Sequence, residues 1–159
     1  MRTDTATRFV HASPDAVYRA FADSGALMAW LPPEGMSGRA LAFEFREGGR
    51  YRIELALAGD GHGASGKTTK RTDVTSGRFL ELIPGKRIVQ TVEFESDDRA
   101  FAGMMEMIWS LDPAPGGTQV TVSAKNVPAG ISPEDHAAGL ASSLENLACF
   151  LASERPSRP

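Results

Sequence analysis

The sequence predicts an α+β fold in which a curved antiparallel sheet wraps around a long C-terminal helix, with two short helices after the first strand. Three observations support this. A strand and two short helical stretches come first, and the region from about residue 39 to 125 alternates apolar and polar residues with period two. A single long amphipathic stretch then closes the chain. Because strand follows strand with only turns between them, we expect antiparallel pairing rather than βαβ units.

The N-terminal part combines a strand with two helix signals. Residues 3–11 are rich in β-branched side chains, which favours a strand. Residues 13–15, Ser-Pro-Asp, supply a capping hydroxyl, a proline at the first helical position and an acid in the first turn, so a helix is expected to begin there. A second short helix around residues 27–30 is expected to end at Pro32, because proline lacks the N–H that continues a helix.

Six further strands are expected in the period-two region. Gly48, Pro84 with Gly85, and residues 115–117 mark turns between them. In each strand one set of alternating side chains is apolar, which indicates one buried face. The expected strands cover residues 41–46, 51–57, 68–82, 87–95, 104–111 and 118–124.

The closing helix has a clear start and one apolar face. Residues 132–135, Ser-Pro-Glu-Asp, resemble a capping box with proline at the first helical position. The leucines that recur at helical spacing after it, and that are expected to lie on the sheet, are Leu140, Leu144, Leu147 and Leu151. We interpret residues 1–153 as a single domain and residues 154–159 as a polar C-terminal tail.

Composition narrows the class of protein. A chain of 159 residues with 42% hydrophobic and 23% charged residues is typical of one globular domain. A net charge of −3 argues weakly against nucleic acid or an anionic membrane as the main partner. The single cysteine, Cys149, excludes an intramolecular disulfide, and no apolar run approaches the ~20 residues that span a bilayer. We therefore expect a cytoplasmic location.

The segment GHGASGKT, residues 61–68, matches the pattern of a phosphate-binding loop. Such a loop needs a helix directly after it, because the helix N-terminus and the loop N–H groups hold the phosphates together. Residues 67–76 contain four threonines, and Val74 is their one sizeable apolar residue. A helix here would have no apolar face to pack on a sheet, and the threonines favour a strand. We interpret residues 59–68 as a hairpin connection without nucleotide-binding residues, and His62 as a turn residue.

Several segments resemble one protein superfamily in their order and spacing. They are VYRAFADSGALMAW at 17–30, FREGG at 45–49, LELIPGKRIV at 80–89 and HAAGLASSLENLACFL at 136–151. These segments resemble the START-like (SRPBCC) ligand-binding proteins, in the branch named for the activator of a heat-shock chaperone ATPase. The branch usually has tryptophan where this chain has Leu140.

The resemblance implies a helix-grip fold, in which an incomplete sheet wraps around the long helix and leaves a cavity that often takes an apolar ligand. It implies no particular reaction, because the fold hosts binders, cyclases and chaperone partners. Three functions remain open. They are binding of a small hydrophobic or aromatic molecule, a cyclase or aromatase type of enzyme that uses the same cavity, and a chaperone-interacting module.

Strand parity predicts which side chains face the cavity without help from the resemblance. In residues 104–111 the face with Met105, Met107 and Trp109 is wholly apolar, whereas the other face carries Glu106 and should point outward. The same reasoning applies to the other strands and to the apolar side of the closing helix. The expected cavity residues are Trp30, Phe43, Phe45, Tyr51, Ile53, Leu55, Gln90, Val92, Met105, Met107, Trp109, His136, Leu140 and Leu144.

Polar residues on these apolar faces carry more information than the hydrophobic ones. Gln90 and the Tyr51 hydroxyl need partners if buried, and His136 is expected at the cavity mouth. A neighbouring backbone group or a ligand would satisfy each of them, and simple core packing is the alternative for the apolar residues.

The sequence assigns no catalytic residue, metal or cofactor. It lacks a Ser/His/Asp arrangement in a strand-turn-helix setting, and Cys149 has no histidine near it in the sequence. Three scattered histidines and one cysteine argue against a metal site. The expected partner is a small hydrophobic molecule, with a chaperone as a further candidate and the choice between monomer and homodimer open.

Overall fold

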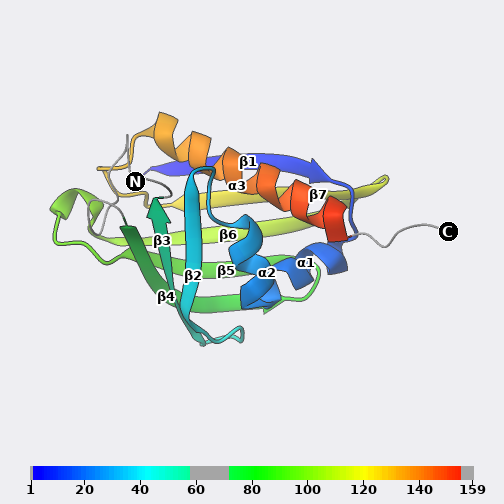
Figure 1. The fold of residues 1–159 in the computed structure, drawn as a ribbon, viewed down its shortest axis with the longest axis horizontal. Coiled ribbons are helices and arrows are strands. Elements are labelled where there is room, and N and C mark those ends of the chain that lie inside the picture. Colours follow the sequence, from blue (N-terminus) through cyan, green and yellow to red (C-terminus); the bar gives the residue numbers. More distant parts are fainter. Residues whose placement is uncertain (1, 58–71, 155–159) are drawn as a thin grey trace.

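The computed structural model describes residues 2–57 and 72–154, in which seven strands form one antiparallel sheet that curves around a long helix (Figure 1). The strand order is β1-β7-β6-β5-β4-β3-β2. This confirms the predicted α+β architecture, with two short helices after the first strand. The elements are β1 (Thr3–Val10), α1 (Pro14–Ala22), α2 (Ser24–Trp30), β2 (Met36–Phe43), β3 (Arg50–Leu57), β4 (Thr72–Ile83), β5 (Arg87–Phe94), η1 (Arg99–Phe101), β6 (Met104–Ala114), β7 (Gly117–Lys125) and α3 (Pro133–Glu154).

Each of the three α-helices begins at a residue whose side chain caps the helix N-terminus. The Ser13 hydroxyl accepts a hydrogen bond from the backbone N–H of Ala16 at 3.2 Å, and the Ser132 hydroxyl accepts one from Asp135 at 3.0 Å. Asp23 ends α1 and also caps α2, because its carboxylate accepts from the N–H of Ala26. These bonds satisfy N–H groups that have no partner inside the helix.

The apolar side of α3 lies against the sheet, and polar side chains fasten the helix to the end of α2. Leu144 and Leu147 are almost completely buried in the core. The Ser143 hydroxyl donates to the carbonyl of Leu31 at 2.6 Å, and the Asn146 amide donates to the carbonyl of Pro32 at 2.9 Å. The position of α3 over the sheet is therefore held from both its apolar and its polar sides.

The strand expected at residues 41–46 lies earlier in the chain than predicted. β2 ends at Phe43, and its pairing with β3 shifts register between Ala40 and Ala42. Leu41 at this irregularity is 38% exposed, although the simple alternation would place it with Phe43 on one face. A bulge adds one residue to one strand, so side chains on either side of it change faces, and period-two reading fails there.

Strands β4 and β5 approach each other very closely at Gly77, two residues before their register shifts between Phe79 and Glu81. A Cβ built at Gly77 would lie 1.9 Å from the carbonyl oxygen of Thr91, so the two backbones approach too closely for any side chain. Tyr51 is the cross-strand neighbour of Gly77 on β3. Its hydroxyl reaches past the glycine and donates a hydrogen bond to the same Thr91 carbonyl. Gly77 is thus required by close packing of three strands.

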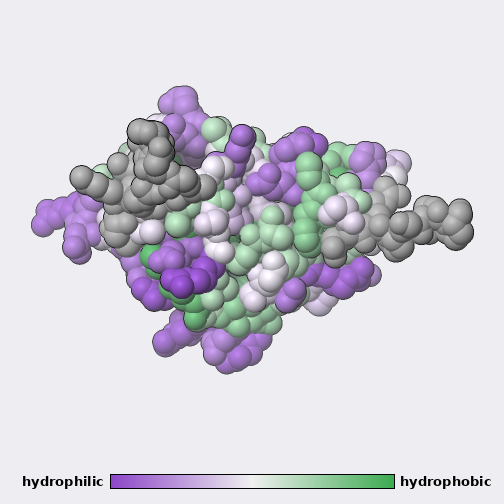
Figure 2. Space-filling view, viewed as in Figure 1, coloured by the Kyte–Doolittle hydropathy of each residue, from purple (hydrophilic) through white to green (hydrophobic). Residues whose placement is uncertain are grey.

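The phosphate-loop pattern, together with His62, lies outside the described residues. The strands before and after it, β3 and β4, pair with each other in antiparallel register. In the described part of the chain, no helix is long and apolar enough to cross a membrane. On the face shown in Figure 2, hydrophobic residues gather over α2, where it lies between β2 and α3.

Candidate functional site

A cavity of about 520 Å³ lies between the first half of α3 and the inner faces of β3, β5 and β6. Its volume falls within the range of ~300–1,000 Å³ that is usual for small-molecule sites. Several predicted residues line it. They are Tyr51, Ile53, Leu55, Gln90, Val92, Met105, Met107, Trp109, His136 and Leu140.

Trp30 and Leu144 do not line this cavity, because both are buried in the core beside it. The Trp30 ring packs edge-on against Phe21 and Trp109, at centroid distances of 4.9 and 5.9 Å. Its indole N–H donates to the backbone carbonyl of Ala20 at 3.0 Å. Leu144 is 1% exposed. For these two residues the structure shows core packing, the alternative that the apolar pattern leaves open.

Phe43 and Phe45 also lie away from the cavity, in an aromatic cluster below α1 and α2. Their rings stack on each other at 5.9 Å, and Phe45 packs edge-on against Phe79 at 5.0 Å. Tyr18 of α1 covers Phe45 from the other side. This cluster leaves a void of only about 30 Å³, so this end of the sheet is solidly packed.

The polar groups on the floor of the cavity bond to the protein itself. The Tyr51 hydroxyl donates to the Thr91 carbonyl, and the Trp109 indole donates to the Gln90 side-chain oxygen at 3.0 Å. Burial raises the pKa of the Tyr51 phenol, against the opposing effect of a hydrogen bond from Gln90, so the phenol stays protonated. Among the described residues, no buried side-chain nitrogen or oxygen lacks a hydrogen-bond partner.

The cavity mouth carries an acid that sequence reasoning missed. The His136 ring nitrogen Nδ1 lies 2.7 Å from a carboxylate oxygen of Asp4, which comes from β1. Arg2 donates to both oxygens of the same carboxylate, at 3.2 and 3.0 Å. Burial would raise the pKa of Asp4, but the hydrogen bonds from His136 and Arg2 outweigh it and hold this pKa below its usual value. The only signal in the sequence is an acid within a threonine-rich strand.

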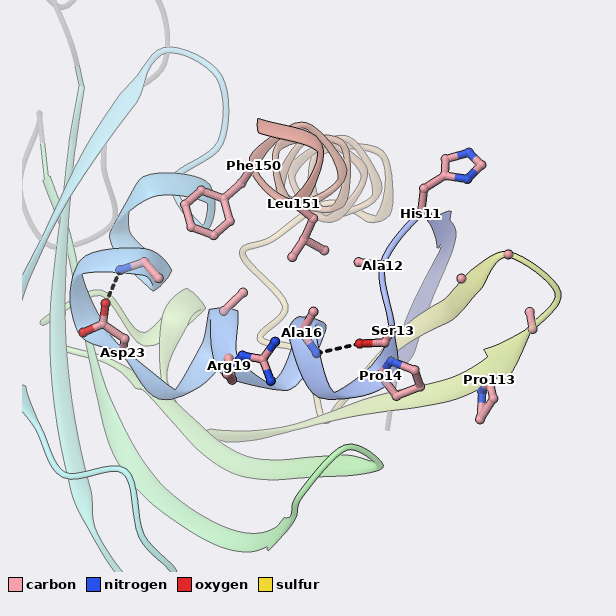
Figure 3. Close-up of a pocket in the computed structure, with 15 residues that line it drawn as sticks. His11, Ala12, Ser13, Pro14, Ala16, Arg19, Asp23, Pro113, Phe150 and Leu151 are labelled. Carbon is pink, nitrogen blue, oxygen red and sulfur yellow. Dashed lines mark hydrogen bonds between the residues drawn. The ribbon is translucent and has the colours of Figure 1, made fainter. Parts of the chain in front are cut away.

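A larger hollow, of about 890 Å³, lies at the opposite end of α3 (Figure 3). Phe150 and Leu151 of α3 line it, and the Leu151 side chain points toward α1. The side chains of Ser13 and Asp23 line it, but both accept the helix-capping bonds drawn there. Much of the remaining lining is alanine, glycine and proline, which offer little for recognition. We therefore place the candidate site in the smaller cavity, where aromatic and methionine side chains converge with an oriented histidine.

Within residues 2–57 and 72–154, no group of three His, Cys, Asp or Glu side chains is arranged to hold a metal ion. Cys149 is free and exposed on α3. The site is a mostly apolar chamber with a bonded floor, Asp73 and Thr75 of β4 on one wall, and a carboxylate-supported imidazole at its mouth.

Comparison with solved structures gives close matches over nearly the whole chain. A crystal structure from Chromobacterium violaceum is 34% identical, with a TM-score of 0.83, and the match covers 94% of this chain and 96% of that chain. The AHSA1 protein from Silicibacter pomeroyi is 18% identical, with a TM-score of 0.78 and coverage of 97% and 100%. A protein from Rhodobacter sphaeroides is 20% identical, with a TM-score of 0.78 and coverage of 96% and 93%. The last two show the fold alone.

The family comparison agrees with the structural one. None of the curated proteins compared with the chain matches it. The profile described as activator of Hsp90 ATPase homolog 1-like protein matches residues 11–152, which include every element from α1 to β7 and most of α3. With the same fold and the 34% identical structure beside it, the chain belongs to the family of activator of Hsp90 ATPase homolog 1-like proteins.

Proposed function

We propose that the protein binds a small, mostly apolar molecule in the cavity between α3 and the sheet. The observation that supports this proposal is that successive side chains on the inner face of one strand are buried to different degrees. On β3, Ile53 is 4% exposed whereas Leu55 is only half-buried, and on β6 Met105 is 2% exposed whereas Met107 is half-buried. Apolar side chains that line a space unfilled by the protein gain free energy when an apolar ligand covers them.

The chemistry of the lining suits an apolar ligand of variable shape. Met105 and Met107 have unbranched side chains that adapt to different outlines and make favourable contacts with aromatic rings. Val92 and Leu140 add aliphatic surface on opposite walls. The polar floor is already bonded within the protein, so a ligand can cover it without leaving a hydrogen bond unmade.

The same floor gives less support to a cyclase or aromatase type of enzyme. Such a reaction needs a group that accepts or donates a proton at the ligand. The Tyr51 phenol donates to the backbone and has a raised pKa, and the Gln90 oxygen accepts from Trp109. Both groups are therefore engaged in holding the sheet, which leaves His136 at the mouth as the predicted residue that could still move a proton.

The proposal is tested by replacing a side chain of the cavity wall with a larger one that takes up part of the cavity. We expect Leu55→Phe to weaken binding of apolar probes such as naphthalene derivatives and medium-chain fatty acids by on the order of tenfold, because the larger ring occupies ligand space. Calorimetric titration measures affinity, and thermal denaturation measures the stabilisation that binding gives the folded state.

Leu80→Phe is the matched control, because Leu80 is 48% exposed and does not line the cavity. It should leave both affinity and thermal stabilisation unchanged. Equal binding by the two variants, or no stabilisation of the unsubstituted protein by any probe, would rule the proposal out.

The family match supports a second candidate, a chaperone-related module. If the protein acts on an Hsp90-type chaperone, adding it in excess should change the ATPase rate of that purified chaperone. An unchanged rate, together with no complex in analytical ultracentrifugation, would exclude this role and leave ligand binding as the function.

A further inference from the structure

The polar contacts at the cavity mouth determine which atom of His136 meets a ligand. Asp4 accepts hydrogen bonds from Arg2 at both oxygens and has a pKa below its usual value, so it is a carboxylate at neutral pH. A carboxylate accepts hydrogen bonds and donates none. The His136 nitrogen Nδ1, 2.7 Å from it, must therefore carry the hydrogen. In the neutral ring this leaves Nε2 as an acceptor with a lone pair.

The accessibility of Nε2 follows from the rule that fully buried polar atoms have hydrogen-bond partners. His136 lines the cavity, and its side chain is 13% exposed. In the described part of the chain, every fully buried side-chain nitrogen or oxygen has a partner. Asp4 of β1 occupies Nδ1, so Nε2 is the ring nitrogen that remains for a ligand at the cavity mouth.

The surroundings of this acceptor favour a neutral donor over an anion. Asp135 lies on the same turn of α3 and lines the same mouth, so a carboxylate adds negative charge there. The guanidinium of Arg2 is directed to Asp4. A ligand with a hydroxyl group would meet an acceptor at the mouth, whereas an anionic headgroup would meet Asp135 without a matching cation.

We propose that His136, positioned by Asp4, accepts a hydrogen bond from a ligand hydroxyl, so that the cavity selects neutral phenol-like or alcohol-bearing apolar molecules over analogues without the donor. This inference rests on the proposed function and names its ligand class. The apolar body of the ligand lies against Met105, Met107 and Leu140, and its hydroxyl points to the first turns of α3. Asp4 touches no ligand and acts as a positioning residue.

The test compares two probes that differ in one hydrogen-bond donor, 2-naphthol and 2-methoxynaphthalene. We expect the unsubstituted protein to bind the naphthol roughly five- to tenfold more tightly, since a net hydrogen bond is gained. His136→Phe should bind the two probes equally while retaining affinity for the methyl ether. Asp4→Asn should reduce the preference, because an asparagine amide donates to Nδ1 and moves the ring hydrogen to Nε2.

A control variant and a spectroscopic measurement keep the test independent of folding losses. Glu134→Gln removes a carboxylate from the same turn of α3, outside the cavity lining, and should retain the preference. Asp135→Asn tests whether the other carboxylate at the mouth makes the contact instead. Nitrogen-15 NMR of the imidazole should show an unprotonated Nε2 whose signal moves with 2-naphthol and not with its methyl ether.

Each outcome decides between the two proposals. Equal binding of both probes by the unsubstituted protein, or an unmoved Nε2 signal, overturns the role of His136 and leaves the apolar cavity intact. A preference lost in Asp135→Asn assigns the donor contact to Asp135 and also overturns it. If neither probe nor any other apolar compound binds, the proposed function fails and this inference with it.

Discussion

The inner face of the sheet has two ends built from the same kind of residues with opposite results. Under α1 and α2, Phe21 and Phe79 border a void of about 30 Å³, and Trp30 packs edge-on against Phe21. Under the first half of α3, Met107 and Leu55 border a cavity of about 520 Å³. The difference comes from the helices: α1 and α2 bring large aromatic rings to one end, whereas α3 brings Gly139 and Leu140 to the other. Apolar strand faces alone therefore do not determine whether a fold encloses a core or a chamber.

The largest effect is expected from removing a ring at the packed end. Trp30→Ala should lower the free energy of unfolding by about 3–5 kcal/mol, because the surrounding rings cannot collapse into the space and the bond to Ala20 is lost. Met107→Ala should cost much less, since Met107 already borders unfilled space. Urea denaturation of both variants measures the contrast. Equal losses would show that the two ends are packed alike.

A substitution of Gly77 should give the next largest loss of stability. Gly77 lies opposite Tyr51, whose side chain borders both the cavity and the packed end. Gly77→Ala is expected to lower stability by about 1–3 kcal/mol, since the new methyl group would overlap the Thr91 carbonyl and displace the Tyr51 hydroxyl. Gly139→Ala is the matched control. A Cβ there meets no atom within 4 Å, so the helix should gain up to about 1 kcal/mol. Thermal and urea unfolding of both variants would sharpen or remove this contrast.

The smallest effect is a pH dependence confined to the cavity end. The pKa of Asp4 is lower in the folded protein than in the unfolded chain, so its stabilising contribution is complete above the unfolded value of about 4 and is lost as the pH falls through the folded value. Asp4→Asn should therefore show a shallower loss of stability in acid than the unsubstituted protein. Urea titrations between neutral pH and about pH 3 measure it.

Asp135→Asn serves as the comparison for this pH dependence, because Asp135 is exposed on the same turn of α3. It should leave the acid slope close to that of the unsubstituted protein. The near-ultraviolet signal of Trp30, at the packed end, and of Trp109, which borders both ends, should change only when the whole domain unfolds. An acid slope that Asp4→Asn leaves intact would place the sensitive carboxylate elsewhere.

Local signals were sufficient to predict most of the fold. Ser13 and Ser132 mark helix starts by supplying capping hydroxyls, and Pro84 with Gly85 marks a turn between paired strands. These signals work because the physical cause lies within a few residues of the chain. The displaced β2 strand shows the limit, since the bulge at Leu41 depends on how β2 meets β3 and not on its own alternation.

The candidate site was less accessible to sequence reasoning, for two physical reasons. Parity identifies the face of a strand but not the position along it. It therefore groups Phe43 and Phe45 with Leu55, although Phe43 and Phe45 border the packed end and Leu55 the cavity. The pair of Asp4 and His136 joins residues 132 positions apart, and no local pattern predicts such a meeting. The partner of Gln90, the Trp109 indole, likewise depends on the register between β5 and β6.

The pairing of β1 with β7 has a consequence for how the protein is made. Val10 lies opposite Thr118 and Thr3 opposite Lys125, so the first strand to be synthesised finds its neighbour only after the last strand exists. The mouth of the cavity forms only after the first turns of α3 have been made, because these turns bring His136 to Asp4. Because contacts between distant parts of a chain are slow to form, folding should be late and cooperative rather than stepwise. A growing chain on the ribosome therefore has no closed cavity between the sheet and α3 until the first turns of α3 have emerged.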